Sequence, residues 1–263
     1  MDLGISGRTA FVAASSRGLG RAAAEALAAE GVHLLMNARG EGPLAEAAGA
    51  VRETHGVRVL EAPGDLADPG VVQRVLAAGF EEFGRFDIMV TNIGGPPAGP
   101  FESFSPEDWR AAIGQNLESV LNLVRGVLGG MEERGWGRII NITSIAVKEP
   151  IPNLILSNSL RAAVTGFAKT LAGEVAPHGV TVNNVMPGYT RTDRIMELSE
   201  KNAALRGTTP EQELGRWAEQ IPAGRVGEPE ELGALIAFLA SERAAYITGT
   251  SIAVDGGWLR ALI

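Results

Sequence analysis

The sequence predicts a single α/β domain with a doubly wound, parallel sheet of the Rossmann type, and three observations support this. Short apolar runs alternate with longer segments of helical periodicity, which is typical of consecutive β-α-β units. The apolar runs are continuous rather than alternating, as expected for parallel strands that are covered on both faces. A turn containing Gly18 and Gly20 joins the first apolar run to the first helical segment, where this fold binds phosphate.

The pattern places strands and helices in strict alternation over most of the chain. The expected strands are Thr9–Ala14, Val32–Asn37, Val57–Ala62, Phe86–Thr91, Gly137–Thr143, Val180–Val185 and Ser251–Val254. The expected helices are Gly18 to about Glu30, about Pro43 to Thr54, Pro69–Phe83, Glu107 to about Glu133, Leu154–Val175 and Pro229–Ala240.

Local signals fix several helix starts. Pro69 and Pro229 stand at first helical positions, where a missing N–H is harmless. Ser105-Pro106-Glu107-Asp108 is a cap for the segment that follows, which is either one long helix or two in series. The polar segment from Tyr189 to about Gly224 follows a strand's carboxyl end, and we interpret it as a lid over a ligand rather than a surface excursion.

Composition narrows the class of protein. The 263 residues are 45% hydrophobic and 21% charged, as in an ordinary globular domain, and no apolar run reaches the ~18 residues that span a bilayer. The net charge of -8 argues against nucleic-acid binding. The lack of cysteine excludes disulfides and thiolate catalysis, and the three histidines are too far apart in sequence for metal-ligand spacing. These features predict a cytoplasmic protein with no metal, nucleic-acid or membrane partner.

The glycine turn is the first candidate ligand site. Its residues can approach a pyrophosphate at a helix N-terminus, whose N–H groups and dipole attract negative charge. The residues expected to bind the cofactor here are Ala14, Ser15, Ser16, Arg17, Gly18, Leu19 and Gly20.

The end of the second strand indicates which dinucleotide binds. A carboxylate there would bond a ribose 2′-hydroxyl, but the sequence reads Met36-Asn37-Ala38-Arg39. Arg17 and Arg39 instead offer two guanidinium groups suited to a 2′-phosphate. We therefore favour NADP (NADPH) over NAD; the alternative is two solvated surface arginines.

With these motifs the chain resembles the short-chain dehydrogenase/reductase family, particularly its 3-oxoacyl-carrier-protein reductase-like members, over nearly the whole length. The resemblance implies that Asp65 and Leu66 contact the adenine. It further implies that Asn92 and Gly94 form the turn beside the cofactor, that Asn116 is the helix asparagine and that Ser144 is the catalytic serine. The matching motif on the nicotinamide side contains Pro187, Gly188, Thr190 and Thr192.

Two departures from the family pattern stand out. The family's phosphate turn begins with Thr-Gly, whereas this one begins with Ala13-Ala14. Alanine avoids backbone strain at the second position only if its φ is not positive. We therefore expect an altered affinity for the cofactor. The family's Tyr-x-x-x-Lys pair lies thirteen residues beyond the serine, where this chain has Ser157 and Arg161.

The substituted site leaves two hypotheses open. A phenol with a pKa near ~10 can be tuned toward neutrality, but a serine hydroxyl is a far weaker acid and a guanidinium is a poor proton donor. The first hypothesis is an NADP-dependent oxidoreductase acting on a carbonyl or alcohol of a small molecule. In it Ser144 binds the reacting oxygen, Asn116 organises water, and Ser157 and Arg161 occupy the altered acid site, with Arg161 near the ribose. The second is a non-catalytic, homo-oligomeric protein that binds a dinucleotide or senses a small molecule.

Other residues have open roles. Tyr189 is a weak substitute for the missing phenol, and Lys148 is either near the cleft or a solvated loop residue. The long helical segments and the apolar end 258–263 suit a dimer or tetramer as well as internal packing. The substrate stays open among acyl thioesters, steroids, sugars and small ketones.

Overall fold

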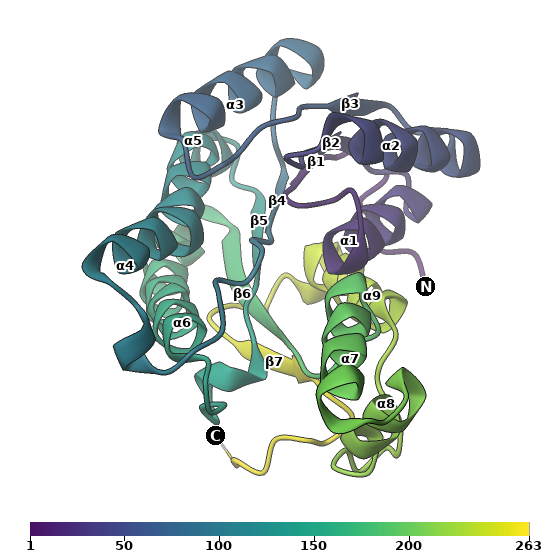
Figure 1. Cartoon of the computed structure of the whole chain (residues 1–263). Helices are drawn as coiled ribbons and strands as arrows, with labels where there is room; N and C mark the ends of the chain where they lie inside the picture. The colour runs from purple at the N-terminus through teal and green to yellow at the C-terminus, as the bar shows by residue number, and fades with distance from the viewer. Residues whose placement is uncertain (263) are drawn as a thin grey trace.

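The fold is a seven-stranded parallel sheet between two layers of helices (Figure 1). The computed structural model describes residues 1–262; Ile263, the last residue of the apolar end considered above, lies outside the described residues. The strand order is β3-β2-β1-β4-β5-β6-β7, so the chain winds outward from β1 in one direction and then in the other. The predicted fold class is confirmed.

The elements follow the predicted alternation. The strands are β1 (Thr9–Val12), β2 (His33–Met36), β3 (Val59–Glu61), β4 (Ile88–Thr91), β5 (Gly137–Ile142), β6 (Val180–Pro187) and β7 (Ser251–Val254). The helices are α1 (Gly18–Ala29), α2 (Glu41–His55), α3 (Pro69–Phe83), α4 (Pro106–Ile113), α5 (Ser119–Glu133), α6 (Ile155–Val175), α7 (Asp193–Arg206), α8 (Pro210–Ala218) and α9 (Pro229–Ala240). Short 3-10 turns occupy Phe101–Ser103, Ile145–Val147, Ala176–His178 and Glu242–Ala244.

Most boundaries differ from prediction by one or two residues. The first strand ends at Val12 rather than Ala14, because Ala13, although buried, and Ala14 already belong to the turn. Conversely, β6 continues to Pro187, because its last residues pair with β7. Apolar sequence predicts burial well, but ladder hydrogen bonds decide where a strand ends.

The sheet separates two hydrophobic cores. Side chains of α1, α2 and α9 pack on one face, and those of α3, α5 and α6 pack on the other (Figure 1). Strand residues contribute to both cores because successive side chains point to opposite faces. Within residues 1–262 no helix is long and apolar enough to cross a membrane.

The segment predicted as one long helix or two is two helices joined by a π-helical turn, Gly114–Glu118. The first of them is capped as predicted, since Ser105 and Asp108 form reciprocal hydrogen bonds, although it begins at Pro106 rather than Glu107. π-Helical turns are rare and often occur at functional sites. This one contains Asn116.

The segment 189–224 contains α7 and α8, which pack on one another. Their contact encloses Glu213, whose fully buried carboxylate accepts hydrogen bonds from Arg206 at 2.8 Å and Thr208 at 2.7 Å. A small apolar cluster that includes Leu214 and Trp217 packs the helical pair against Tyr189. The segment is therefore an ordered helical pair.

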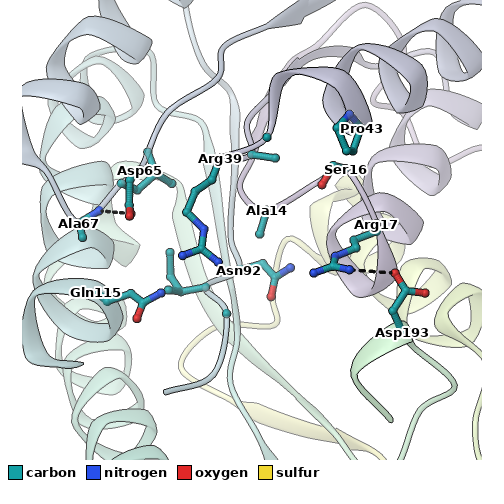
Figure 2. A pocket seen from close by; sticks show the side chains of 15 residues that line it. Ala14, Ser16, Arg17, Arg39, Pro43, Asp65, Ala67, Asn92, Gln115 and Asp193 are labelled. Carbon is teal, nitrogen blue, oxygen red and sulfur yellow. Dashed lines mark hydrogen bonds and ion pairs between the residues drawn. The ribbon is translucent and has the colours of Figure 1, made fainter. Parts of the chain in front are cut away.

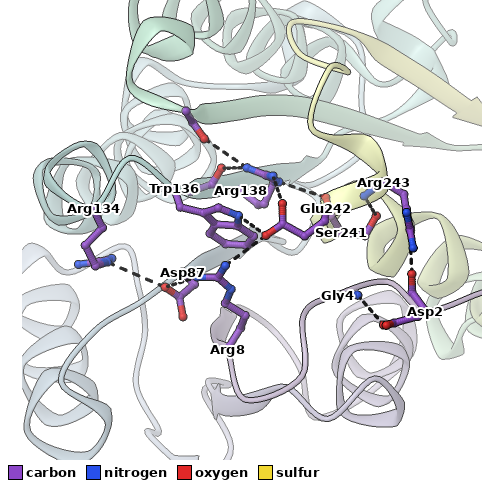
Figure 3. Close-up of polar contacts among 12 residues, drawn as sticks. Asp2, Gly4, Arg8, Asp87, Arg134, Trp136, Arg138, Ser241, Glu242 and Arg243 are labelled. Carbon is purple, nitrogen blue, oxygen red and sulfur yellow. Dashed lines mark hydrogen bonds and ion pairs between the residues drawn. The ribbon is translucent and has the colours of Figure 1, made fainter.

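A polar network lies at the amino-terminal end of the central strands (Figure 3). The buried Asp87 carboxylate accepts a hydrogen bond from the Thr9 N–H at 3.1 Å. It also forms ion pairs with Arg85 at 3.1 Å, Arg8 at 3.7 Å and Arg134 at 3.9 Å. Because Arg8, Thr9 and Arg134 lie far from Asp87 in sequence, the network joins β1 to β4 and to the end of α5.

Candidate active site

Two cavities adjoin the carboxyl ends of the strands, where open α/β sheets bind ligands. The first, of about 620 Å³, lies between the phosphate turn, the end of β2 and the end of β4. The second, of about 680 Å³, lies between the end of β5, the start of α6 and α7. Gly94 lines the first cavity and Gly95 the second, so the two meet at the turn after β4.

The phosphate turn has the close backbone packing that its glycines suggest. Gly18 has a φ of +56°, and a Cβ on Gly20 would overlap the carbonyl of Ala14. Ala14 itself has a φ of +48°, so the condition under which alanine would be unstrained is not met. A left-handed alanine costs roughly 1–2 kcal/mol relative to a relaxed backbone, and the surrounding strand and helix hold it in place.

The structure divides the predicted cofactor residues into three groups. Those that line the first cavity are Ala14, Ser16, Arg17, Arg39, Asp65, Leu66, Asn92 and Gly94. Those that line the second are Arg161, Pro187 and Gly188. Those that line neither are Ser15, Gly18, Leu19, Gly20, Thr190 and Thr192.

Some residues of the third group form internal hydrogen bonds or precede a helix. Ser15 is fully buried, and both its N–H and its hydroxyl donate to the carbonyl of Asn37, at 2.9 and 3.2 Å. Thr190 is buried and donates to the Gly188 carbonyl at 3.3 Å. Thr192 precedes the first residue of α7.

The two arginines chosen from sequence enter the first cavity from different elements (Figure 2). Arg39 follows β2 and points into the cavity, while Arg17 turns toward Asp193 at the start of α7, 3.4 Å away. Both members of this ion pair are largely exposed, and exposed pairs contribute less than about 1 kcal/mol. Arg17 can therefore leave Asp193 and bind a phosphate at little cost in free energy.

Ser144, Ser157 and Arg161 all line the second cavity. Ser144 lies two residues after the end of β5 and caps the short turn that follows, its oxygen accepting from the Ala146 N–H at 3.1 Å. That bond orients the hydroxyl and leaves its proton available for an acceptor in the cavity. Ser157 lies on the first turn of α6, one helical turn before Arg161.

Arg161 connects α6 to the ends of two strands. Its guanidinium donates to the carbonyls of Ile142 and Ile93, both at 2.6 Å. Burial, and then the nearby charge of Arg194, lowers the pKa of Arg161 to about 10. The side chain therefore keeps its proton at neutral pH and supplies a fixed positive charge.

Asn116 is buried and lines neither cavity. Its amide nitrogen donates to the Ala112 carbonyl at 3.1 Å, but its Oδ1 has no hydrogen-bond partner within residues 1–262. A buried polar atom without a partner costs about 1–3 kcal/mol, which makes this oxygen a natural acceptor for a bound water.

Of the residues left open by sequence, Tyr189 lines the second cavity and Lys148 lies exposed outside both. Tyr189 stacks on Trp217 with ring centroids 5.5 Å apart, and burial raises the pKa of its hydroxyl. It is therefore less acidic than an ordinary phenol, the opposite of the tuning that a substitute acid needs.

Sequence reasoning missed several lining residues. Gln115, in the π-helical turn, and Asp193 line the first cavity, and Arg194 and Lys201 line the second. From sequence, Arg194 and Lys201 could be recognised only as residues of the expected lid. The sequence of a helix does not show which of its faces lines the cavity.

Comparisons with known proteins agree with this geometry. A family model described as enoyl-(acyl carrier protein) reductase matches residues 13–259. A monensin polyketide synthase putative ketoacyl reductase of Streptomyces virginiae is 37% identical, over 95% of this chain and 96% of that one. The 3-oxoacyl-[acyl-carrier-protein] reductase of Escherichia coli is 37% identical, over 95% of this chain and 97% of its own length. The solved structure of L-sorbose reductase from Gluconobacter frateurii, complexed with NADPH and L-sorbose, superimposes with a TM-score of 0.96 at 37% identity and covers all of both chains.

Proposed function

The chain belongs to the short-chain dehydrogenase/reductase family, and on that premise we propose that it is an NADP-dependent oxidoreductase that reduces a carbonyl compound or oxidises the corresponding alcohol. The observation that carries the proposal is the junction of two cavities at the carboxyl edge of the sheet. One has two arginines fit for a nucleotide phosphate, and the other contains Ser144. A 3-oxoacyl compound is one candidate substrate, because relatives named ketoacyl and 3-oxoacyl reductases align with nearly the whole chain.

The residues present fit a nicotinamide dinucleotide phosphate. The positive end of α1 and the close approach of its backbone at Gly20 suit a pyrophosphate. Arg17 and Arg39 suit the 2′-phosphate, while Asp65 and Leu66 suit the adenine side. NADPH is also the cofactor in the L-sorbose reductase complex. When bound, the reduced nicotinamide supplies the hydride.

We assign the chemistry of the second cavity to Ser144 and Arg161. The Ser144 hydroxyl donates a hydrogen bond to the carbonyl oxygen, which strengthens as negative charge develops on that atom. Arg161 adds a fixed positive charge near the same site, and Ser157 replaces the bulky phenol of the family with a small hydroxyl. This arrangement stabilises an oxyanion but holds no phenol tuned to protonate it.

The proton then has to come from water. Asn116 offers a buried oxygen without a partner among residues 1–262, next in sequence to Gln115, which lines the first cavity. We propose that this oxygen fixes a water that relays a proton past Ser157 and Arg161. General acid catalysis typically contributes ~10²–10⁴-fold, so a water relay predicts a slow but measurable reaction.

The decisive experiment follows NADPH oxidation with a panel of ketones and acyl thioesters, beside a direct NADPH titration. Ser144→Ala is expected to lower kcat about 10²-fold while leaving the NADPH Kd unchanged, because it removes an oxyanion donor and no cofactor contact. A Ser105→Ala variant, which changes a serine that caps α4 outside both cavities, is the control. Equal kcat in Ser144→Ala and the parent would remove Ser144 from the mechanism.

The missing tyrosine and lysine favour one second candidate: a dinucleotide-binding or small-molecule-sensing protein without turnover. It predicts tight NADPH binding together with no oxidation by any member of the panel. The same two measurements therefore separate the candidates.

We further propose a homo-oligomer, dimer or tetramer, in the cytoplasm, with residues 189–224 acting as the substrate lid. The outward face of α6 supports the assembly, since Ala162, Ala163, Gly166 and Gly173 are exposed and small enough for close helix packing. Light scattering on the purified chain should give a mass of two or four subunits, and a sharp monomer peak would contradict the assembly.

A further inference from the structure

The second cavity is positively charged in an acidic protein. Three cationic side chains, Arg161, Arg194 and Lys201, line it together with one carboxylate, Glu197, whereas the whole chain has a net charge of -8. Neither Arg194 nor Lys201 forms an ion pair with any acid among residues 1–262. A concave site with an excess of one sign attracts ligands of the opposite sign.

Arg194 is the cation on which the positive charge of the second cavity is centred. Its guanidinium lies over Gly95, so closely that a Cβ at that position would overlap it, and this places Arg194 at the junction of the two cavities. It is also near enough to Arg161 for its charge to lower the pKa of that side chain. Two guanidinium groups that line one cavity are thus close enough to interact electrostatically.

Nothing in the stability of the lid accounts for this arrangement. Arg194 stands in the first turn of α7, where the helix dipole disfavours a cation. The neighbouring arginines behave differently: Arg191 pairs with Glu228 at 3.1 Å, and Arg206 pairs with Glu213 at 2.8 Å. Arg194 alone among these three points its charge into the cavity.

The remaining lining indicates a short apolar chain. Ile145, Ile151, Leu154, Ile195 and Leu198 contribute apolar surface around the serines. A ligand that suits both the apolar and the cationic lining has a carbonyl near Ser144, a short hydrocarbon chain and an anionic group near Arg194.

We propose that the substrate is an oxo acid whose carboxylate is bound by Arg194, with Arg161 and Lys201 adding to the local positive charge. This rests on the proposed reductase function and narrows its substrate class. Arg194 forms a charge-assisted, bidentate contact with the carboxylate, as guanidinium groups do. The contact also offsets the repulsion between Arg194 and Arg161.

The cofactor is a competing source of negative charge near Gly95. The cofactor phosphates have their own cations, Arg17 and Arg39, in the first cavity, and Asp193, beside Arg194 in sequence, faces that cavity instead. Arg194 is therefore assigned to the substrate, and the experiment has to separate the two sources.

The test compares each oxo acid with its own methyl ester, which keeps the carbonyl and chain but lacks the charge. For 2-oxohexanoate and 3-oxohexanoate, Arg194→Gln should lower kcat/KM about 10- to 100-fold, and the esters should change less than about 3-fold. The matched control is Arg191→Gln, which removes the same charge three residues earlier from a side chain that lines neither cavity and is already paired. It should leave the ratio of acid to ester unchanged.

Three outcomes overturn the proposal. An equal loss of kcat/KM for acid and ester in Arg194→Gln would show that Arg194 does not bind the carboxylate. A weaker NADPH affinity in the same variant would assign Arg194 to the cofactor. A parent enzyme with a higher kcat/KM for the esters would exclude oxo acids as the substrate. If no substrate turns over, calorimetric titration of hexanoate into the NADP⁺ complex separates the two proposals. Binding that disappears in Arg194→Gln supports the anion site although the reductase function fails, and no binding to the parent rejects the anion site as well.

Discussion

Reversing the charge of Arg17 and Arg39 together should weaken NADPH binding about 10³-fold. Both side chains line the first cavity, and hydrogen bonds to a charged group contribute about 1.5–3 kcal/mol each. Glutamates at these positions would also repel the 2′-phosphate. NADH lacks that phosphate, so its affinity should fall much less and the preference between the two cofactors should reverse. Fluorescence titration with both dinucleotides measures the effect.

The control is Arg58→Glu combined with Arg110→Glu. It changes the net charge by the same amount at exposed arginines that line neither cavity and form only exposed ion pairs. It should leave both dissociation constants within about 3-fold, because distant surface charges are largely screened at physiological salt. An unchanged NADPH affinity in the Arg17 and Arg39 double variant would refute their assignment to the phosphate.

Asp87→Ala should destabilise the fold by about 3 kcal/mol. The variant leaves the buried Thr9 N–H without its acceptor and leaves Arg8, Arg85 and Arg134 around an uncompensated site. Removing one member of a buried ion pair typically costs 3–5 kcal/mol, and the value here falls at the low end because the arginines keep access to water. Denaturant unfolding should show a lower midpoint with an unchanged slope.

Glu107→Ala provides the comparison for this network. Glu107 pairs with Arg110 at 2.6 Å, but both side chains are more than 70% exposed, so its removal should change stability by less than about 0.5 kcal/mol. If Asp87→Ala were equally mild, the network in Figure 3 would be a surface feature rather than the bond between β1 and the neighbouring elements.

In the candidate active site, the side chains assigned to substrate binding are held in place, but none is suited to donate a proton. Ser144 and Arg161 are held by bonds to backbone groups, at Ala146, Ile142 and Ile93, so their positions do not depend on a substrate. What the site lacks is a phenol tuned toward neutral pH, since burial makes Tyr189 a weaker acid still. Under the mechanism proposed above, cations stabilise the developing negative charge of the substrate and water delivers the proton.

The sequence alone determined the layered fold, the phosphate turn and the positions of the serine and its altered partners. Apolar runs fixed which segments are buried, and the glycines, prolines and caps fixed where helices begin. Arg17 and Arg39 could be chosen because they stand in the phosphate turn and at the end of the second strand, at the carboxyl edge of a parallel sheet. Ser144, Ser157 and Arg161 could be chosen because they align with the catalytic motif of the family that the sequence resembles.

Only the tertiary structure decided which of these side chains line a cavity. Ser15 belongs to the phosphate turn in sequence, yet both its polar groups are used by Asn37, whereas Ser16 next to it lines the cavity. The positive φ of Ala14 and the unpaired charge of Arg194 over Gly95 were equally hidden. Sequence periodicity reports burial through local geometry, but the direction of a turn residue and the pairing of a charge depend on contacts between segments far apart in the chain.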